Sequence, residues 1–438
     1  MQHFQTSFFY DLQELIHKAP LMRKYYYIFK SLNLSALKDR NDRIGRTGYS
    51  QHAILRALIV KHLEGIKSIP QLIRYLHSIP PLMEMCGFDL GSLPDETQFY
   101  RFLKNTKNST LKAIHKTAND VLIENNLVSL DEFILDSKPV KAATKENNFK
   151  NPNRNTTNKS KKPRRNPRAT LSYYSCQIIN GKKQNMIFFW GFRTHAVVSK
   201  EGICLVEKTL PNNITDQDAA FSLIRELKRR YRFKKGAIFL ADKAYDVREL
   251  YTFIVEQMKS TPYIPLNKRN SKDDKTFGPH GCPLCDAGLE MKSAGKWTEG
   301  NRDRIKFRCP LKVSKKLSAE HNNVCPANDP SFDTGKCYGC TKYLDVTDDA
   351  RSRVPRDSKE FKDTFKDRQT IERYFSRLGD REAEQTTHYG FTAISNQMTI
   401  AHLTASLIAV AAGILLKQPE KMRCYRTFAN PPDLRRAC

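Results

Sequence analysis

Three acidic residues occupy positions where an α/β protein places its chemistry. Asp136 and Asp242 each end a short apolar run, in FILD and in AIFLAD, and both runs predict strands. Glu372 lies four residues after Arg368 in DRQTIERYFSRL, so the two side chains share one face of a predicted helix. A single aspartate after an apolar run is usually a turn residue or a cap, so the case depends on all three acids together.

Three carboxylates around one point repel one another unless a cation lies between them. Oxygen ligands with open coordination positions favour Mg²⁺ or Mn²⁺. Two such ions about 4 Å apart can activate a nucleophilic oxygen and stabilise the leaving oxygen in a displacement at phosphorus. We therefore expect Asp136, Asp242 and Glu372 to hold Mg²⁺ or Mn²⁺ in a site that cuts or transfers phosphodiesters.

The composition agrees with a polyanionic substrate. Of the 438 residues, 74 are Lys or Arg and 46 are Asp or Glu, which gives a formal charge of +28. A chain this basic usually binds nucleic acid. Its apolar fraction of 39% excludes wholesale disorder, and its length predicts two or three domains. The first residues lack a basic segment followed by an apolar one, so we expect a cytoplasmic protein.

The segment 399–416 is apolar and about long enough to span a bilayer. His402 interrupts it, small residues are frequent in it, and the sequence has no second segment of this kind. A buried core helix is the better interpretation, and we expect no membrane partner.

Strand and helix patterns alternate between the acids, which is typical of a mixed α/β sheet. The predicted strands are 133–140, 169–179, 185–198, 236–246 and 262–265, and the predicted helices begin at Asp216, as an N-cap, and at Val247. Between the first two strands, residues 141–168 hold ten Lys or Arg and one acid. This basic loop is either a solvated linker or a phosphate contact, and its place after the first acid favours phosphate contact.

Residues 49–104 show the apolar spacing of several short helices. Short helices with basic outer faces fit a helix-turn-helix DNA reader. They fit equally well a helical bundle that only packs on the rest of the chain.

Two CxxC knuckles and two single cysteines lie in a polar segment, residues 267–345. The knuckles are Cys282 with Cys285 and Cys337 with Cys340, and the single cysteines are Cys309 and Cys325. Paired knuckles suit tetrahedral Zn²⁺, which can fold a segment with few apolar residues. We expect a zinc-ribbon-like insertion with the knuckle cysteines as ligands, and Cys309, Cys325 and His280 as alternatives. The competing interpretation is six free cysteines without metal.

Taken together, these residues resemble bacterial insertion-sequence transposases of the Asp-Asp-Glu (DDE) type. Asp136 and Asp242 match the first two acids, and Glu372 matches the third. In the most similar subgroup the third motif reads Tyr-x2-Arg-x3-Glu-x6-Lys, which here is Phe365, Arg368, Glu372 and Gly379. GFRTH (191–195) and NNITDQDA (212–219) resemble stretches between the acids, and GYSQHAILRALIVKHLEG with CGFDLGSLPDETQFYRFL resembles the preceding helical domain. The resemblance covers about residues 45–415.

Two positions depart from that motif. Phe365 for Tyr is a mild change, because both rings can pack. Gly379 for Lys removes a cation that the family uses near bound DNA, and glycine weakens the helix by about 1 kcal/mol relative to alanine. Arg373 or Arg377 could serve instead, and Gly379 is the first residue to revert to Lys in an impaired copy.

The resemblance implies an RNase H-like core and cut-and-paste transposition. Water would attack the phosphodiester at the transposon end, and the released 3′-OH would attack target DNA. Arg368 would orient Glu372 or contact phosphate. The implied partners are double-stranded DNA and a second copy of the chain, at the prokaryotic nucleoid. Candidates for contacts to the DNA backbone are Lys138, Lys243, Arg373 and Arg377, and each could equally be a solvated surface charge.

The predicted fold class is α+β multidomain: a helical N-terminal domain, an RNase H-like mixed α/β core and a cysteine-rich insertion. The expected parts are 1–125 (helical, DNA-binding), 126–266 and 346–418 (core), 267–345 (insertion) and 419–438 (tail). Two other functions stay open at this point: a zinc-containing DNA-binding descendant of a transposase, and a metal-dependent nuclease without strand transfer. The presence of all three acids argues against the first, and a strand-transfer assay on linear DNA ends separates the second.

Overall fold

The computed structural model describes residues 14, 18–39, 48–147, 162–179, 182–267, 282–299, 302–333, 339–345, 350–351, 354, 356, 358–380 and 383–424. The chain divides into two units, Met1–Pro265 with Arg356–Cys438, and Leu266–Pro355. The acids and the predicted DNA contacts belong to the first unit, and the cysteine knuckles belong to the second.

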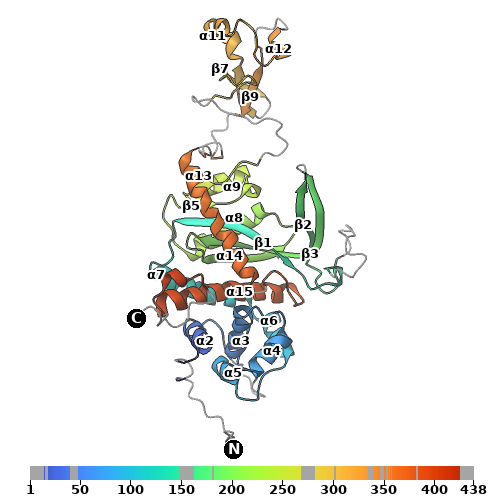
Figure 1. Ribbon diagram of the computed structural model, residues 1–438, viewed down its shortest axis with the longest axis vertical. Coiled ribbons are helices and arrows are strands. Elements are labelled where there is room, and N and C mark those ends of the chain that lie inside the picture. The colour runs from blue at the N-terminus through green and yellow to red at the C-terminus, as the bar shows by residue number, and fades with distance from the viewer. Residues whose placement is uncertain are drawn as a thin grey trace, which may run out of the picture. The chain divides into compact units, whose positions relative to one another are not determined.

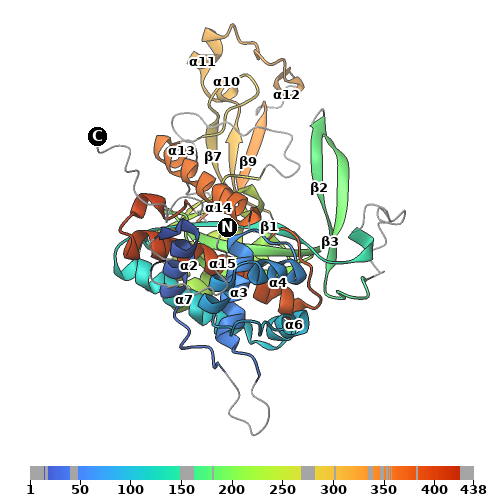
Figure 2. The same ribbon diagram turned by 60° about the horizontal axis from the view of Figure 1, so that its bottom comes forward.

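The first unit is built around a six-stranded sheet (Figure 1). Its mixed character was predicted, whereas one of its strands, β4, was not. Its order is β2-β3-β1-β5-β6, with β4 paired to β3 outside this path. The strands β1, β5 and β6 are parallel, whereas β3 is antiparallel to β1, β2 and β4. The bounds are β1 (Glu132–Lys141), β2 (Thr170–Ile179), β3 (Lys182–Ser199), β4 (Cys204–Pro211), β5 (Ile238–Leu240) and β6 (Thr261–Tyr263). Figure 2 shows the β2–β3 hairpin extending away from the rest of the sheet.

Burial changes along β1 at the first acid. Phe133, Ile134 and Leu135 are at most 1% exposed, as in a central strand that is covered on both faces. From Asp136 to Pro139 the strand is only half-buried. The apolar run therefore fixes the strand in the core, and the polar residues that follow lie at its accessible end.

The C-terminal apolar segment forms α15 (Phe391–Val410), continued by a π-helical turn η6 (Ala411–Leu415). This is the one described helix long and apolar enough to cross a membrane, and 78% of its most apolar window is buried. It contacts α7 (Asn108–Glu124) and β4, and lies between the sheet and the N-terminal helices (Figure 1). The predicted core helix is confirmed.

The N-terminal helices pack on one another and on α15. They are α2 (Pro20–Lys30), α3 (Gln51–Leu63), α4 (Ile69–His77), α5 (Pro80–Cys86) and α6 (Glu96–Asn105). Side-chain caps begin three of them: Ser50 for α3, Ser68 for α4 and Asp95 for α6. Their packing is that of a helical bundle, and DNA contact by these helices stays a prediction.

Two local expectations were wrong. The helix α8 (Asp216–Arg230) is capped by Thr215, whose hydroxyl accepts from the Asp218 N–H, and not by Asp216. The segment that carries Arg368 and Glu372 is not one helix: α13 (Lys359–Phe365) is followed by a 3₁₀ turn, η5 (Lys366–Arg368), and then by α14 (Gln369–Gly379).

The remaining short elements connect these parts. In the first unit they are η1 (Lys145–Asn147), η3 (Lys243–Tyr245), α9 (Arg248–Thr252), η4 (Phe253–Gln257) and η7 (Pro419–Lys421). Most of the predicted basic loop, residues 148–161, lies outside the described residues.

The second unit contains a three-stranded antiparallel sheet, in the order β7-β8-β9. Its elements are β7 (Lys292–Glu299), β8 (Arg302–Arg308), α10 (Pro310–Val313), α11 (Lys315–Glu320), α12 (Pro330–Asp333) and β9 (Thr341–Asp345). Its core consists of two small clusters, one around Cys309, Cys325 and Phe332 and the other around Cys285, Met291 and Phe307.

Candidate active site

Two neighbouring parallel strands position the first two acids, with Asp136 inside β1 and Asp242 just after β5. Ile134 on β1 pairs with Leu240, the last residue of β5, and each acid lies two positions further along the chain, Asp242 still with extended backbone. Residues at equivalent positions of parallel strands point to the same side of a sheet, so Asp136 and Asp242 are neighbours. Asp242 also caps η3 by accepting from the Ala244 N–H at 2.8 Å. The sheet alone therefore brings these two acids together.

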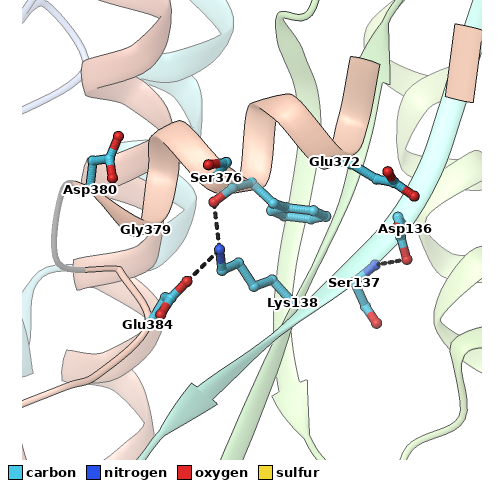
Figure 3. Close-up of a pocket in the computed structure, with 9 residues that line it drawn as sticks. Asp136, Ser137, Lys138, Glu372, Ser376, Gly379, Asp380 and Glu384 are labelled. Carbon is cyan, nitrogen blue, oxygen red and sulfur yellow. Dashed lines mark hydrogen bonds and ion pairs between the residues drawn. The ribbon is translucent and has the colours of Figure 1, made fainter. Parts of the chain in front are cut away.

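Arg368 connects the third acid to the first. Its Nη1 donates to Glu372 Oε1 at 2.6 Å, and its Nη2 donates to Asp136 Oδ2 at 3.4 Å. In Figure 3 the Glu372 side chain on α14 extends toward Asp136 on β1. The predicted Arg368–Glu372 pair is thus present, and it extends to a carboxylate more than 200 residues earlier in the chain.

The surroundings of Asp136 perturb its protonation. Burial, with smaller contributions from the nearby carboxylates Asp242 and Asp216, raises its pKa from 3.8 to about 6. The Ser137 N–H, which donates to Asp136 Oδ1 at 2.8 Å, and the Arg368 guanidinium oppose this rise. The site therefore concentrates negative charge in a partly buried place, which favours binding of a cation.

A cleft of about 530 Å³ lies beside these acids, between β1 and α14 (Figure 3). Four carboxylates and one ammonium line it. The described lining residues are Asp136, Ser137, Lys138, Glu372, Phe375, Ser376, Gly379, Asp380 and Glu384.

A buried polar chain fixes α14 against the sheet. The Tyr374 hydroxyl hydrogen-bonds with His402 Nδ1 at 2.6 Å, and Thr194 Oγ1 hydrogen-bonds with His402 Nε2 at 3.0 Å. His402, which seemed only an interruption of an apolar run, links α15 to both α14 and β3. Apolar side chains at helical spacing, Ile371, Phe375 and Leu378 among them, add to the same contact face. Glu372 is therefore carried by a helix whose other face is anchored.

A second polar network lies behind Asp136, and the sequence reasoning missed it. Ser137 Oγ donates to Asp216 Oδ1 at 2.7 Å, and Arg193 Nη1 donates to Ser137 Oγ at 2.9 Å. His195 is fully buried, with Nδ1 3.4 Å from Asp216 Oδ1. The buried Tyr245 hydroxyl also lies near these acids, and burial and their charges raise its pKa. The signal was available, because GFRTH and NNITDQDA contain Arg193, His195 and Asp216.

The donor set fits a hard divalent cation. Arg368 places a positive charge between Glu372 and Asp136, so this point already accepts a cation. Carboxylate oxygens are the ligands that Mg²⁺ and Mn²⁺ prefer. Among the described residues, however, no three His, Cys, Asp or Glu side chains are close enough together to hold one ion in this conformation.

The predicted DNA contacts are not all near the cleft. Lys138 lines it, whereas Lys243 is exposed at the start of η3. Arg373 is exposed on α14 and donates to Gln369. Arg377 lines a separate small pocket with Gly202 and Arg423. Of these four cations, the structure brings only Lys138 into the cleft.

The cysteines of the second unit converge in part. Cys340 packs against both apolar clusters, and therefore near Cys285 and Cys309. Burial raises the pKa of the Cys340 thiol to about 12, and the neighbouring Cys309 and Cys285 contribute to this rise. Cys337 and His280 lie outside the described residues. Within the described part of the chain no group of three ligands able to hold a metal is present.

Two comparisons with protein families agree with this site. The family described as transposase DDE domain matches residues 129–408, which contain all three acids and Arg368. The family described as transposase domain (DUF772) matches residues 10–105, which contain the N-terminal helices. The first match covers well over half of the chain, so the protein belongs to the DDE transposases. A search of curated proteins found no match. Transposases of this family act on DNA, cleave and rejoin it, and generally use Mg²⁺ or Mn²⁺.

Proposed function

We propose that this protein is a cut-and-paste transposase, which cleaves DNA at the ends of a mobile element and joins those ends to target DNA. The observation that carries the proposal is the bridge from Glu372 through Arg368 to Asp136, at the edge of the sheet where Asp242 also lies. It joins acids from two distant parts of the sequence, both of which line the cleft, and the charge of the nearby Asp242 acts on Asp136. An RNase H-like core and the subgroup with the Tyr-Arg-Glu-Lys motif belong to the same proposal.

In this proposal, Asp136, Asp242 and Glu372 hold two divalent ions. When bound, Mg²⁺ or Mn²⁺ supplies the activation of the attacking oxygen and the stabilisation of the leaving oxygen. Arg368 neutralises Asp136 and Glu372 in the free protein and orients Glu372. If the acids held a metal cation, the Arg368 guanidinium would be available to a phosphate group, which it could contact through two N–H donors. The anchoring of α14 through Tyr374 and His402 keeps Glu372 facing β1.

Lys138, Lys243, Arg373 and Arg377 contact the DNA backbone in this proposal, together with the basic loop 141–168 and the N-terminal helices. The high positive charge of the chain supports this role. Each phosphate contact releases counterions, so affinity for DNA falls steeply as salt rises. A dimer on DNA, working at the nucleoid in the cytoplasm, would bring two transposon ends together.

The substitution Asp242→Asn tests the proposal. It keeps the shape of the side chain and its cap on η3 but removes a negative charge from the acid cluster. We expect loss of cleavage at the element's own end sequence, with DNA binding retained. Retained cleavage would remove Asp242 from the site. Cleavage by the wild type without joining of linear ends to a target would indicate a nuclease instead.

Zinc in the second unit is a separate part of the proposal. The gathering of Cys285, Cys309 and Cys340, with Cys282 packed on the same cluster, supports it, since thiolates are the ligands that structural Zn²⁺ prefers. The two knuckles, including Cys337, remain the first choice of ligands, and Cys309 and Cys325 the alternatives. Metal analysis of the purified chain tests this part. If no zinc is found, the six cysteines are free thiols.

A further inference from the structure

The ammonium of Lys138 is held in the cleft by two acceptors. Its Nζ donates to the carbonyl oxygen of Phe375 at 2.6 Å and forms an ion pair with Glu384 Oε1 at 2.5 Å (Figure 3). The two partners differ in exposure: the Lys138 side chain is 16% exposed, whereas that of Glu384 is 57% exposed. The cation is the fixed member of the pair, and the carboxylate is the outer one.

The Lys138 ammonium has favourable surroundings at this position even without Glu384. Phe375 lies in the last turns of α14, and the C-terminal end of a helix carries partial negative charge. The Phe375 carbonyl supplies a direct acceptor from the same helix. Lys138 therefore has a reason to stay in place if its carboxylate partner leaves.

Glu384, in contrast, can leave by rotating its side chain alone. Its backbone is fixed beside β1, because its carbonyl accepts from the Lys141 N–H at 2.8 Å and the Lys141 carbonyl accepts from the Thr386 N–H at 3.0 Å. An ion pair with one partner more than half exposed contributes little to stability. A competing anion can therefore displace the carboxylate without moving the chain.

Gly379 leaves the room that this pair occupies. A Cβ at position 379 would lie 2.6 Å from Glu384 Oε1 and 3.1 Å from Lys138 Nζ. The backbone of Gly379 is outside the left-handed region, so space rather than conformation accounts for glycine here. The Lys138 ammonium, which comes from β1, therefore lies beside position 379 at the end of α14, where this chain has glycine in place of a lysine.

We infer that Glu384 occupies the place of a DNA phosphate on Lys138 in the free protein, and that a phosphate of the bound strand displaces it. This inference rests on the proposed function, because DNA must enter the cleft. Lys138 follows Asp136 by two positions, so both face the same side of β1, about 7 Å apart along the strand. A phosphate held by Lys138 would therefore lie next to the phosphate at the acids, and Lys138 would position the strand for cleavage.

The test compares two variants that each remove one negative charge from the cleft. Glu384→Gln removes the partner of Lys138, whereas Asp380→Asn removes a lining carboxylate that has no ion pair with Lys138. Affinity is measured by fluorescence anisotropy with a labelled duplex carrying the element's end, in EDTA and low salt. We expect Glu384→Gln to bind about twofold to fivefold more tightly than Asp380→Asn. Equal affinities of the two variants would overturn the inference.

A double-variant cycle with Lys138→Met adds a second criterion. If Glu384 acts through Lys138, the gain from Glu384→Gln disappears in the Lys138→Met background, and a gain that persists there contradicts the inference. Gly379→Ala should behave like Glu384→Gln, because its methyl group pushes the flexible carboxylate aside. Failure of the wild type to bind the duplex at all would contradict the proposed function itself, which distinguishes the two failures.

Discussion

The two units of this transposase hold their functional residues by different means. In the first, the acids extend from strands and a helix whose apolar faces are buried against the sheet and α15, so the core would exist without them. In the second, cysteines are themselves members of both small clusters, around Phe332 and around Met291. In the first unit the acids are not part of the hydrophobic core, whereas in the second unit the cysteines are core residues. The fold of the first unit should therefore survive substitution of its acids, whereas the fold of the second should not survive substitution of its cysteines.

Metal removal should divide the chain most sharply. We expect a strong zinc chelator to make the segment 266–355 sensitive to protease, because its clusters are too small to fold it without cross-links. The rest of the chain should remain resistant. Cys285→Ser should reproduce the effect, and Cys424→Ser, at an exposed cysteine of the first unit, is the control. Unchanged resistance of 266–355 after chelation would remove the difference between the units.

Removing Arg368 should damage activity without damaging the fold. In Arg368→Ala the link between Glu372 and Asp136 is lost, and we expect cleavage at the element's end to slow by about a hundredfold, as for other lost charge-positioning groups. The melting temperature should change little. Lys366→Ala, an exposed cation in the same 3₁₀ turn, is the matched control. Equal rates for the two variants would show that the bridge has no part in cleavage.

The acid site should cost stability, and the cost should depend on pH. The pKa of Asp136 is about 6 in the folded chain against an ordinary 3.8. A raised pKa means that its contribution is complete below pH 3.8 and is lost as pH rises through 6. Asp136→Asn avoids this loss, so without divalent ions it should be more stable than wild type by about 3 kcal/mol at pH 8.

The stability difference between Asp136→Asn and wild type should grow from pH 4 to pH 6 and then level off, as measured by thermal unfolding in EDTA. Asp363→Asn, an exposed carboxylate paired with Lys366, should show no such profile. A wild type that is the more stable protein at pH 8 would contradict the view that the acids are added to a self-sufficient core.

The smallest expected effect concerns the anchoring of α14. Tyr374→Phe leaves His402 Nδ1 without its hydroxyl partner in a buried place, which should lower the free energy of unfolding by about 1 kcal/mol. Cleavage should fall severalfold, because Glu372 is carried by the same helix. Tyr49→Phe, at a tyrosine that is 37% exposed, is the control. A loss of stability with unchanged cleavage would mean that the anchor serves the fold alone.

The sequence predicted the parts of this site that depend on local pattern. Apolar runs ending at Asp136 and Asp242, and an Arg and a Glu four residues apart, are readable without a structure. The network behind Asp136 was readable only as the motifs GFRTH and NNITDQDA. Its contacts were not, because Ser137 and Arg193 meet through the pairing of β1 with β3, and Asp216 comes from α8. Asp216 seemed to be the N-cap of its helix, because Asp and Thr both suit that position; in the structure the cap is the neighbouring Thr215.

Glu384 was missed because nothing local marks it. It reaches the cleft only because residues 384–386 bond to the end of β1, about 240 residues earlier in the sequence. Gly379 seemed a defect in the motif for a similar reason. The cation beside it, Lys138, comes from β1 and not from the helix that carries the motif. Long-range pairing, and not residue type, decides both cases.

The most direct test of the central claim is the dependence of end cleavage on divalent metal, with wild type and Glu372→Ala measured side by side. The substrate is a duplex carrying the element's own end, incubated with EDTA, Mg²⁺ or Mn²⁺. We expect nicking at the end by the wild type only with metal, and none by Glu372→Ala, although both proteins bind the duplex. Metal-independent nicking, or nicking by Glu372→Ala at the wild-type rate, would contradict the three-acid site.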